Sequence, residues 1–293
     1  MKSIEKIIGI IAAVVATFII GARAAAFSVS PMLIEAEAEA GKSYTGVLTV
    51  FGDDHKTEFV RLYIVDWDKL PSGEDMELMA GILERSCSLW VTLSESQLEV
   101  PAKGAVSVKY SFTVPDGTAG SYWTFIMVEG EKAPEKPVRE DDKVQFMVNT
   151  QFRYAVRLFV NVGRRGAMQG KINRVEIGRP AEKGPFKDAP LATKVVFENY
   201  GDFLLKPQGY VEIRNMDGEV VVRTEVPPRF YVIPGHERWI EAPIDKQLAD
   251  GDYLALAVLD FGGESLVAGE AQFSIPIQPE DSVAARGSEN AQK

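Results

Sequence analysis

One stretch, residues 144–162, reads VQFMVNTQFRYAVRLFVNV and alternates apolar with polar side chains over most of its length. Its even-numbered residues from 152 onward are all apolar: Phe152, Tyr154, Val156, Leu158, Val160 and Val162. Successive side chains of a strand point to opposite faces, so this spacing predicts a β-strand with one buried face. The other face carries Gln151, Arg153, Ala155, Arg157, Phe159 and Asn161. A strand usually holds about five or six residues, so we expect this long run to bend or change partners between two domains.

The rest of the chain repeats the same pattern. Residues 106–114 alternate apolar with polar side chains, which predicts a strand that is buried on one face and wet on the other. Further strands are expected at residues 27–34, 41–51, 59–67, 123–128, 171–177, 193–198, 209–214, 219–224, 230–233, 238–242, 253–259 and 270–275. Pro31 falls inside the first of these, and Pro243 should end the strand at 238–242. Residues 76–83 fit either a short helix or an irregular crossover.

Two tyrosines occupy matching places in the two halves. Tyr122 and Tyr253 each follow a Gly-x pair and precede an apolar strand. A tyrosine just after such a corner is typical of immunoglobulin-like sandwiches, where its hydroxyl bonds to backbone around the corner. The repeat predicts an all-β chain with two immunoglobulin-like β-sandwich domains in tandem, at residues 27–162 and 163–276. Residues 277–293 have no apolar period, so we expect a disordered tail.

The N-terminus predicts the compartment. Lys2 and Lys6 precede an apolar run at residues 7–22, and three alanines follow at residues 24–26. This order is typical of a cleaved signal peptide, here residues 1–26. We therefore expect a periplasmic or other extracytoplasmic location, with no membrane span after cleavage. An uncleaved membrane anchor is the alternative, although the run is shorter than the roughly 20 residues that a spanning helix needs.

Composition argues against several classes of function. The net charge of -10 disfavours a nucleic-acid partner, because phosphate binding needs a basic surface. The two histidines, His55 and His236, lie in turn sequences and are expected to be solvated. The single cysteine, Cys87, lies near Trp90 and is expected to be a buried small side chain rather than a reactive thiol. We therefore expect no enzyme activity, metal site or cofactor.

Residues 129–143 contain six acidic and four basic side chains with two prolines. They separate two strand patterns, so we expect a long solvated loop. The alternative is a loop that becomes ordered on a partner.

Several segments follow one another in a known order. They are Phe27-Ser-Val-Ser-Pro-Met-Leu-Ile-Glu35, Ser88-Leu-Trp-Val-Thr-Leu93, Leu98-Glu-Val-Pro101, residues 106–114, Gly120-Ser-Tyr-Trp123 and residues 149–159. This order resembles the N-terminal domain of periplasmic pilus chaperones of the PapD type. It is also similar to the related immunoglobulin-like domain of proteins that interact with WxL proteins. The likeness covers about residues 27–162, and its motifs are loose.

The resemblance implies a way of binding. In pilus chaperones, the last long strand of this domain lends alternating apolar residues to a subunit that lacks a strand, which is β-augmentation. Here the donated face would be Val144, Phe146 and Val148, and Arg157 would hold the partner's terminal carboxylate. The family's second cation belongs to the first strand, but this chain has Met32, Leu33 and Ile34 there. The alternative for residues 144–148 is an ordinary paired strand.

These patterns lead to three functional hypotheses. The first is a non-catalytic chaperone-like or assembly accessory factor for pilus or cell-surface proteins, which binds an exported or cell-surface polypeptide at a strand edge. The second is a structural or adhesive cell-envelope module without chaperone activity. The third is a hydrolase, which would need a cleft between the domains lined by convergent carboxylates.

Overall fold

The computed structural model describes residues 27–131, 151–163, 165–180, 186–228, 230–276 and 285–286. The strands of the first half are β1 (Phe27–Ser30), β2 (Leu33–Ala38), β3 (Ser43–Gly52), β4 (Glu58–Lys69), β5 (Asp75–Leu78), β6 (Val91–Leu93), β7 (Gln97–Val100), β8 (Ala105–Thr113), β9 (Gly120–Gly130) and β10 (Arg153–Val162). A 3-10 turn, η1 (Ser88–Trp90), precedes β6. Those of the second half are β11 (Gly170–Gly178), β12 (Leu191–Asn199), β13 (Gln208–Asn215), β14 (Val220–Glu225), β15 (His236–Ile244), β16 (Gly251–Asp260), β17 (Val267–Ile275) and β18 (Ala285–Arg286).

Some predictions fall outside the described residues. They concern the leader at 1–26, most of the loop at 129–143, the proposed donated face of Val144, Phe146 and Val148, and all but two residues of the tail.

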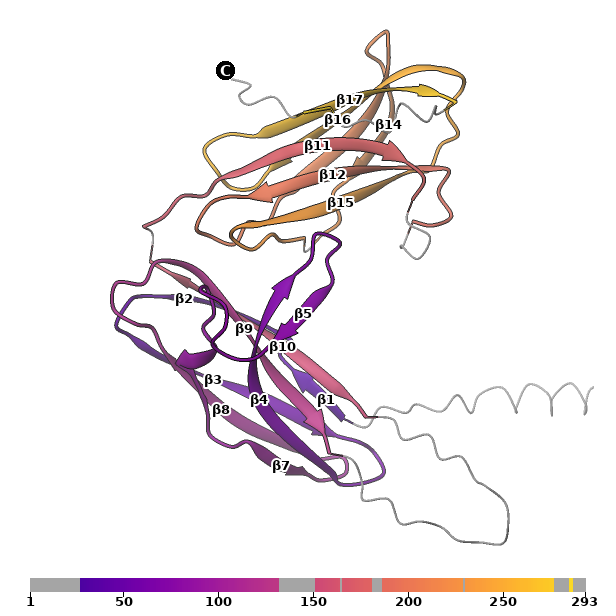
Figure 1. Ribbon diagram of the computed structural model, residues 1–293. Helices are drawn as coiled ribbons and strands as arrows, with labels where there is room; N and C mark the ends of the chain where they lie inside the picture. Colours follow the sequence, from indigo (N-terminus) through magenta and orange to yellow (C-terminus); the bar gives the residue numbers. More distant parts are fainter. Residues whose placement is uncertain are drawn as a thin grey trace, which may run out of the picture.

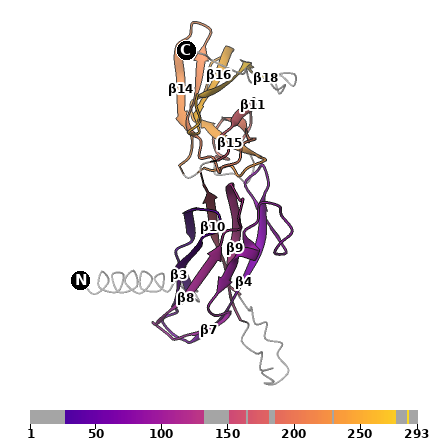
Figure 2. The same ribbon diagram turned by 90° about the vertical axis from the view of Figure 1, so that its left-hand side faces the viewer.

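The first half forms a two-layer sandwich (Figure 1). One sheet has the order β1-β3-β8-β6, and the other has the order β2-β10-β9-β4-β5, with β7 added beside β4. The alternation at residues 152–162 predicted the buried face correctly. Val156, Leu158, Val160 and Val162 are fully buried in the core, and Phe152 and Tyr154 pack at its rim. Figure 2 shows this layering from the side, with β3 and β8 in one layer and β9, β10 and β4 in the other.

The opening strand differs from the prediction. Residues 27–34 were expected to form one strand, but the chain leaves the first sheet at Pro31 and crosses to the second. β1 pairs antiparallel with β3, whereas β2 pairs parallel with β10. Proline has no N–H to donate to a ladder, so the first ladder stops there and the chain starts another.

Residues 76–83 form no helix. Their first residues belong to β5, which makes a hairpin with β4, and the rest form an irregular crossover. The fully buried Asp66 organises this crossover, because its carboxylate accepts hydrogen bonds from the backbone N–H groups of Gly81, Ile82 and Leu83 at 3.1, 2.8 and 2.8 Å. Burial alone would raise the pKa of Asp66, but hydrogen bonds from the Leu83 N–H and the Ser86 hydroxyl hold it below its ordinary value.

The second half forms another two-layer sandwich, with sheets β15-β12-β11-β18 and β14-β13-β16-β17 around its own core. Two details differ from the predictions. β15 continues through Pro243 to Ile244, which is tolerated because β15 lies at the edge of its sheet. At residues 230–233, the structure has an isolated bridge between Val232 and Leu205 instead of a strand.

The tyrosine corner is present in the second sandwich. The hydroxyl of Tyr253 donates to the carbonyl of Ala249 at 3.0 Å, four residues upstream. Tyr122 has a different environment. Its ring centroid lies 4.6 Å from that of Trp90, and among the described residues its hydroxyl makes no corner bond. The two-sandwich fold is therefore confirmed, although only one of its two predicted corner bonds is found.

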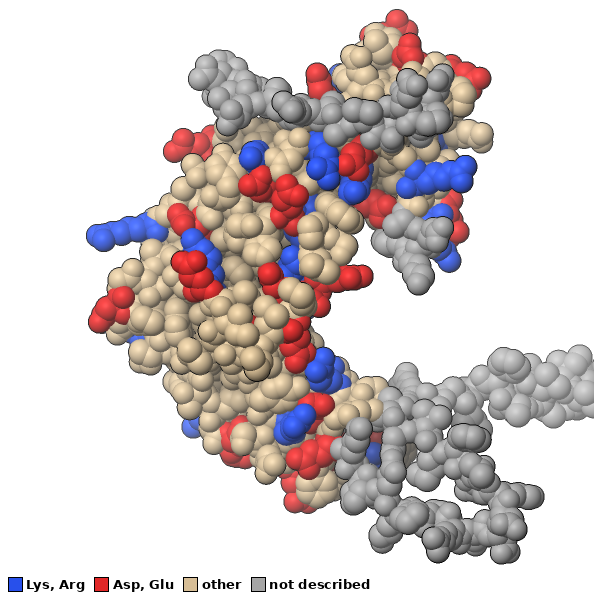
Figure 3. All heavy atoms as spheres, in the orientation of Figure 1, with Lys and Arg blue, Asp and Glu red and all other residues tan. Residues whose placement is uncertain are grey.

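The two sandwiches meet end to end and enclose a third apolar cluster (Figures 1 and 2). The first sandwich contributes Val65, Trp67, Trp123, Phe125, Met127 and Phe159 from the outer face of β4, β9 and β10, and the second contributes Ile233. Phe159 was the large apolar residue on the otherwise polar face of the 144–162 run. It is 1% exposed, and its ring centroid lies 5.3 Å from that of Tyr231 in the second sandwich. The space-filling view shows a concave side between the sandwiches (Figure 3).

Candidate polypeptide-binding site where the two sandwiches meet

One half of β10 has a neighbour on a single side. β9 pairs with β10 over its whole length, from Arg153 to Val162, but β2 pairs only with residues from Arg157 onward. The Arg157 N–H donates to the carbonyl of Met32 at 3.1 Å, so odd-numbered residues of β10 direct their backbone groups toward β2. By the same alternation, Arg153 and Ala155 direct theirs beyond the start of β2, where the described residues supply no strand partner. Among the described residues, the first four of β10 therefore present a free edge.

Glu129 holds the beginning of this edge in place. It lies opposite Arg153 on β9, and its carboxylate accepts from Arg61 and from the hydroxyl of Tyr63, both at 2.8 Å. The side-chain amide of Gln151 donates to its other oxygen at 2.7 Å. Burial alone would raise the pKa of Glu129, but the hydrogen bonds from Arg61 and Tyr63 hold it below its ordinary value.

Arg157 stands where the free edge ends. Its guanidinium pairs with Asp75 at 2.5 Å and lies over the ring of Phe125, with 5.5 Å from its central carbon to the ring centroid. Its side chain is 33% exposed, so it remains accessible from solvent. β2 runs alongside at Leu33 without a basic residue, as its sequence indicated.

Two further cations join Arg157, and neither was found from the sequence. Lys69, at the end of β4, pairs with the same Asp75 and donates to the carbonyl of Gly73 at 3.1 Å. Arg238, on β15, donates to the carbonyl of Tyr231 at 3.3 Å. Burial lowers the pKa of both Lys69 and Arg238, and in Lys69 the ion pair with Asp75 opposes it. We call Lys69, Asp75, Arg157, Tyr231 and Arg238 the junction cluster.

Three hydrogen-bond donors of the junction cluster lack a well-placed acceptor among the described residues. Nε of Arg157, Nε of Arg238 and the hydroxyl of Tyr231 are buried and make no well-aligned hydrogen bond among the described residues, although the Tyr231 hydroxyl lies against the Arg157 guanidinium. Burial raises the pKa of Tyr231, so its hydroxyl keeps its proton and can donate. An unpaired buried donor typically costs about 1–3 kcal/mol. Three cations with one carboxylate are therefore suited to an anion with several acceptor oxygens, such as a carboxylate.

Polar contacts also connect the sandwiches away from the junction cluster. Arg85 pairs with Asp202 at 2.7 Å, and the N–H of Leu204 donates to the hydroxyl of Ser121 at 2.7 Å. His236 was expected to be a solvated turn residue, but it is the first residue of β15, and its Nε2 lies 2.5 Å from a carboxylate oxygen of Asp68.

The other two singled-out side chains match their predictions. His55 lies exposed in its turn, and Cys87 is fully buried, where burial raises the pKa of its thiol.

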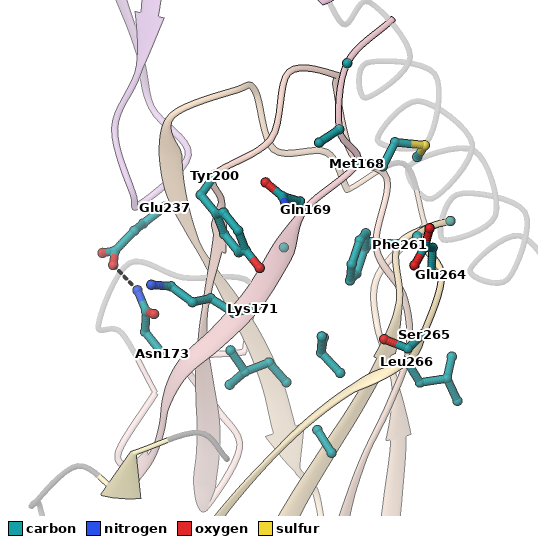
Figure 4. A pocket seen from close by; sticks show the side chains of 18 of the residues that line it. Met168, Gln169, Lys171, Asn173, Tyr200, Glu237, Phe261, Glu264, Ser265 and Leu266 are labelled. Carbon is teal, nitrogen blue, oxygen red and sulfur yellow. Dashed lines mark hydrogen bonds between the residues drawn. The ribbon is translucent and has the colours of Figure 1, made fainter. Parts of the chain in front are cut away.

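A groove in the second sandwich lies between the start of β11 and the loop after β16 (Figure 4). Lys171, Asn173 and Tyr200 line one part of it, and Phe261 and Glu264 line the other. It belongs to one sandwich, whereas the hydrolase hypothesis needs a carboxylate-lined cleft between two.

Across the described ranges there is no group of three or more His, Cys, Asp or Glu side chains placed to hold a metal ion. None of the described segments forms a helix with the length and apolar character needed to cross a membrane.

The chain is similar to solved structures but matches no family model. A scan against protein-family models and a sequence search of curated proteins each found no match. Solved structures of fimbrial chaperones do match. The E. coli chaperone DraB is 17% identical, with 86% of this chain and 96% of that chain covered and a TM-score of 0.38. The Pseudomonas aeruginosa CupB2 chaperone is 11% identical, with coverage of 84% and 99% and a TM-score of 0.37.

A structure of the chaperone–tip adhesin complex of CFA/I fimbriae biogenesis matches at 12% identity, with 84% of this chain and 98% of that chain covered and a TM-score of 0.44. Since the TM-scores are below 0.5, the fold described above rests on its own strand order and register. The chain is an all-β protein of two immunoglobulin-like sandwiches that loosely resembles PapD-like fimbrial chaperones.

Proposed function

We propose that this protein binds an exported or cell-surface polypeptide without catalysis, as a chaperone-like or assembly accessory factor for pilus or cell-surface proteins. The observation that carries the proposal is the free edge of β10, at Arg153–Val156, which leads directly to the cationic junction cluster. An extended segment of the partner adds to this edge by β-augmentation. Backbone hydrogen bonds to Arg153 and Ala155 supply affinity, and residues 144–150 extend the edge so that Val144, Phe146 and Val148 face the partner.

The junction cluster gives the bound segment an end point. A carboxylate at the partner's C-terminus pairs with Arg157 and accepts hydrogen bonds from the Tyr231 hydroxyl and Arg238. Lys69 and Arg238 thus take the place of the cation that the first strand lacks. Charge-assisted hydrogen bonds are about twice as strong as neutral ones, so this end point also fixes the register of the added strand.

The proposal includes a cellular setting. Residues 1–26 are a cleaved signal peptide, the mature protein is periplasmic or otherwise extracytoplasmic, and its domains span residues 27–162 and 163–276. The order of lysines, apolar run and alanines at the N-terminus supports this part.

Photo-crosslinking in cells tests the strand-edge contact. A photoreactive amino acid is placed at Val148 or Ala155, with Thr113, exposed on the opposite sheet, as the control position. We expect one defined exported polypeptide to be captured from the first two positions and not from the third. The Val148→Asp variant should keep its fold and lose a capture made from Ala155. Equal capture from Thr113, or no adduct at all, contradicts the proposal and favours a structural or adhesive envelope module.

A peptide pair tests the end point separately. The C-terminal segment of the captured polypeptide is synthesised with a free carboxylate and as its amide. We expect the free acid to bind at least about tenfold more tightly, which corresponds to about 1.4 kcal/mol. Arg157→Met should remove this difference, while Arg165→Met, a change at an exposed arginine outside the cluster, should preserve it. Equal binding of acid and amide to the unmodified protein would refute the carboxylate end point and leave the strand-edge contact standing.

A further inference from the structure

His236 bridges the two sandwiches through both nitrogens of its ring. Nε2 lies 2.5 Å from Oδ1 of Asp68, at the end of β4 in the first sandwich. Nδ1 lies 2.8 Å from the carbonyl oxygen of Pro234, in the turn that leads into β15. The ring also stands nearly perpendicular to that of Trp123 on β9, with centroids 6.2 Å apart and an angle of 84° between the ring planes. The side chains of His236 and Asp68 are 25% and 26% exposed, so protons can exchange with solvent.

This geometry selects one protonation state. A carbonyl oxygen can only accept a hydrogen bond, so the contact with Pro234 requires a proton on Nδ1. Oδ1 of Asp68 already accepts the backbone N–H of Lys69 at 2.8 Å, so the contact with Asp68 requires a proton on Nε2. Neutral imidazole carries one proton and satisfies one of these contacts, whereas imidazolium satisfies both.

The other charged groups on the surrounding elements have partners elsewhere. Lys69 pairs with Asp75, Arg85 with Asp202 and Lys171 with Glu198. Glu237 accepts from the side-chain amide of Asn173, Asp66 accepts from the backbone of residues 81–83, and Arg238 donates to the carbonyl of Tyr231. Asp68 is thus the charged group that directly contacts the ring.

We propose that His236 is a proton-dependent latch between the two sandwiches. The imidazolium ties β15 to β4 through a charge-assisted hydrogen bond. Loss of one proton breaks one of its two contacts, and the junction opens locally more often. Among side chains, histidine is the one that ordinarily changes its charge between about pH 5 and pH 8.

The latch is close to the junction cluster in the chain. Asp68 precedes Lys69, and His236 lies two residues before Arg238 on the same strand. The inference does not depend on the proposed function, because it concerns contacts within the free protein.

Hydrogen exchange at two backbone amides tests the proposed latch. The N–H of Trp239 donates across the junction to the carbonyl of Pro71 at 2.9 Å, and the N–H of Gly52 donates to Gly104 within the first sandwich at the same distance. Their hydrogen-exchange protection factors, corrected for intrinsic rates, are measured at about pH 5.5 and about pH 8. We expect the protection of Trp239 to be several-fold higher at the lower pH, and that of Gly52 to be unchanged.

Variants show whether the pH dependence of Trp239 protection comes from the imidazole ring of His236. His236→Gln and Asp68→Asn should each leave the protection of Trp239 low at both pH values, while His55→Gln, at the exposed histidine, should behave like the unmodified protein. If the first two variants fold poorly, ring ¹⁵N shifts of the unmodified protein decide, because the latch requires protons on both nitrogens of His236 at about pH 5.5. Equal protection of Trp239 at both pH values, or one unprotonated ring nitrogen at the lower pH, overturns the proposal.

Discussion

The two halves of β10 share one alternation of side chains but differ in what lies beside their backbones. From Arg157 to Val162 the strand lies between β9 and β2, whereas from Arg153 to Val156 β9 is its one neighbour among the described strands. Burial follows the alternation in both halves, since Tyr154 packs at the rim of the core that Val156 and Leu158 fill. The comparison shows that the alternation of side chains and the exposure of the strand's backbone edge are separate properties. The former is local, but the latter depends on where β2 begins.

The largest expected effect lies at the point where the two halves meet. Asp75→Asn removes the carboxylate shared by Lys69 and Arg157 and leaves buried positive charge without a counter-charge. Removing one partner of a buried ion pair is strongly destabilising, so we expect a loss of about 3 kcal/mol in the free energy of unfolding. Urea unfolding measures it, with Asp54→Asn at an exposed turn as the control. An unchanged midpoint for Asp75→Asn would show that the cations do not depend on Asp75.

A matched pair of proline substitutions compares the halves directly. Asn161 and Ala155 both direct their N–H groups away from β9, but only Asn161 has β2 beside it, at Glu37. Asn161→Pro removes a ladder donor together with the side-chain hydrogen bonds to Ser121 and Glu37, and should cost at least about 1–3 kcal/mol. Ala155→Pro removes a donor without a strand partner, so its cost should stay within about 0.5 kcal/mol. Denaturant unfolding of both variants gives the comparison.

The same pair separates folding from binding. Ala155→Pro should fold normally yet lose capture of the partner, since the added strand needs this N–H. If Ala155→Pro destabilises the protein as much as Asn161→Pro does, the first half of β10 is not a free edge.

A smaller effect is expected in acid, at the start of the free half. The pKa of Glu129 is lower in the folded protein than its ordinary value of about 4.3. A carboxyl with a depressed folded pKa stabilises the protein above its unfolded pKa, and this contribution is lost as the pH falls through the folded pKa. The N–H of Gly130 donates to the carbonyl of Phe152 at 3.0 Å, and the protection factor of this amide, corrected for the intrinsic exchange rate, should therefore fall as the pH drops through the lowered pKa of Glu129.

Glu129→Gln serves as the control for that experiment. The variant cannot change charge at this position, so the difference between the two proteins isolates Glu129 from the other carboxyls. The same acid response in both proteins would rule out Glu129 as the clamp of this edge.

Much of the fold followed from local pattern. Alternation predicted the buried face of β10, and a tyrosine after a glycine corner predicted the hydroxyl bond of Tyr253. The burial of Phe159 could also be predicted, because a large apolar residue on an otherwise polar strand face indicates a second packing surface. Its partner, Tyr231, is 72 residues away in the sequence, so the pattern could not name it.

The site was much less predictable. Arg157 was chosen through a family resemblance, and the structure places it at the junction. Lys69 and Arg238 join it from strands of different sandwiches. Nothing in the sequence around a lysine at the end of a strand indicates that its side chain is buried. His236 was misjudged for a similar reason: its Pro-Gly turn is ordinary, and only the packing of the sandwiches brings Asp68 to its ring.

Amide exchange along β10 in the free protein tests the central claim most directly. The N–H groups of Ala155 and Phe159 point to the same side of one strand, four residues apart. Among the described strands β2 lies beside Phe159 but not beside Ala155, and Phe159 is also the more buried of the two residues. We expect the Ala155 amide to exchange at a rate close to that of an unprotected amide, and the Phe159 amide to exchange orders of magnitude more slowly. Comparable slow exchange at both amides would contradict the claim, because it would mean that the edge proposed to receive a partner is already paired.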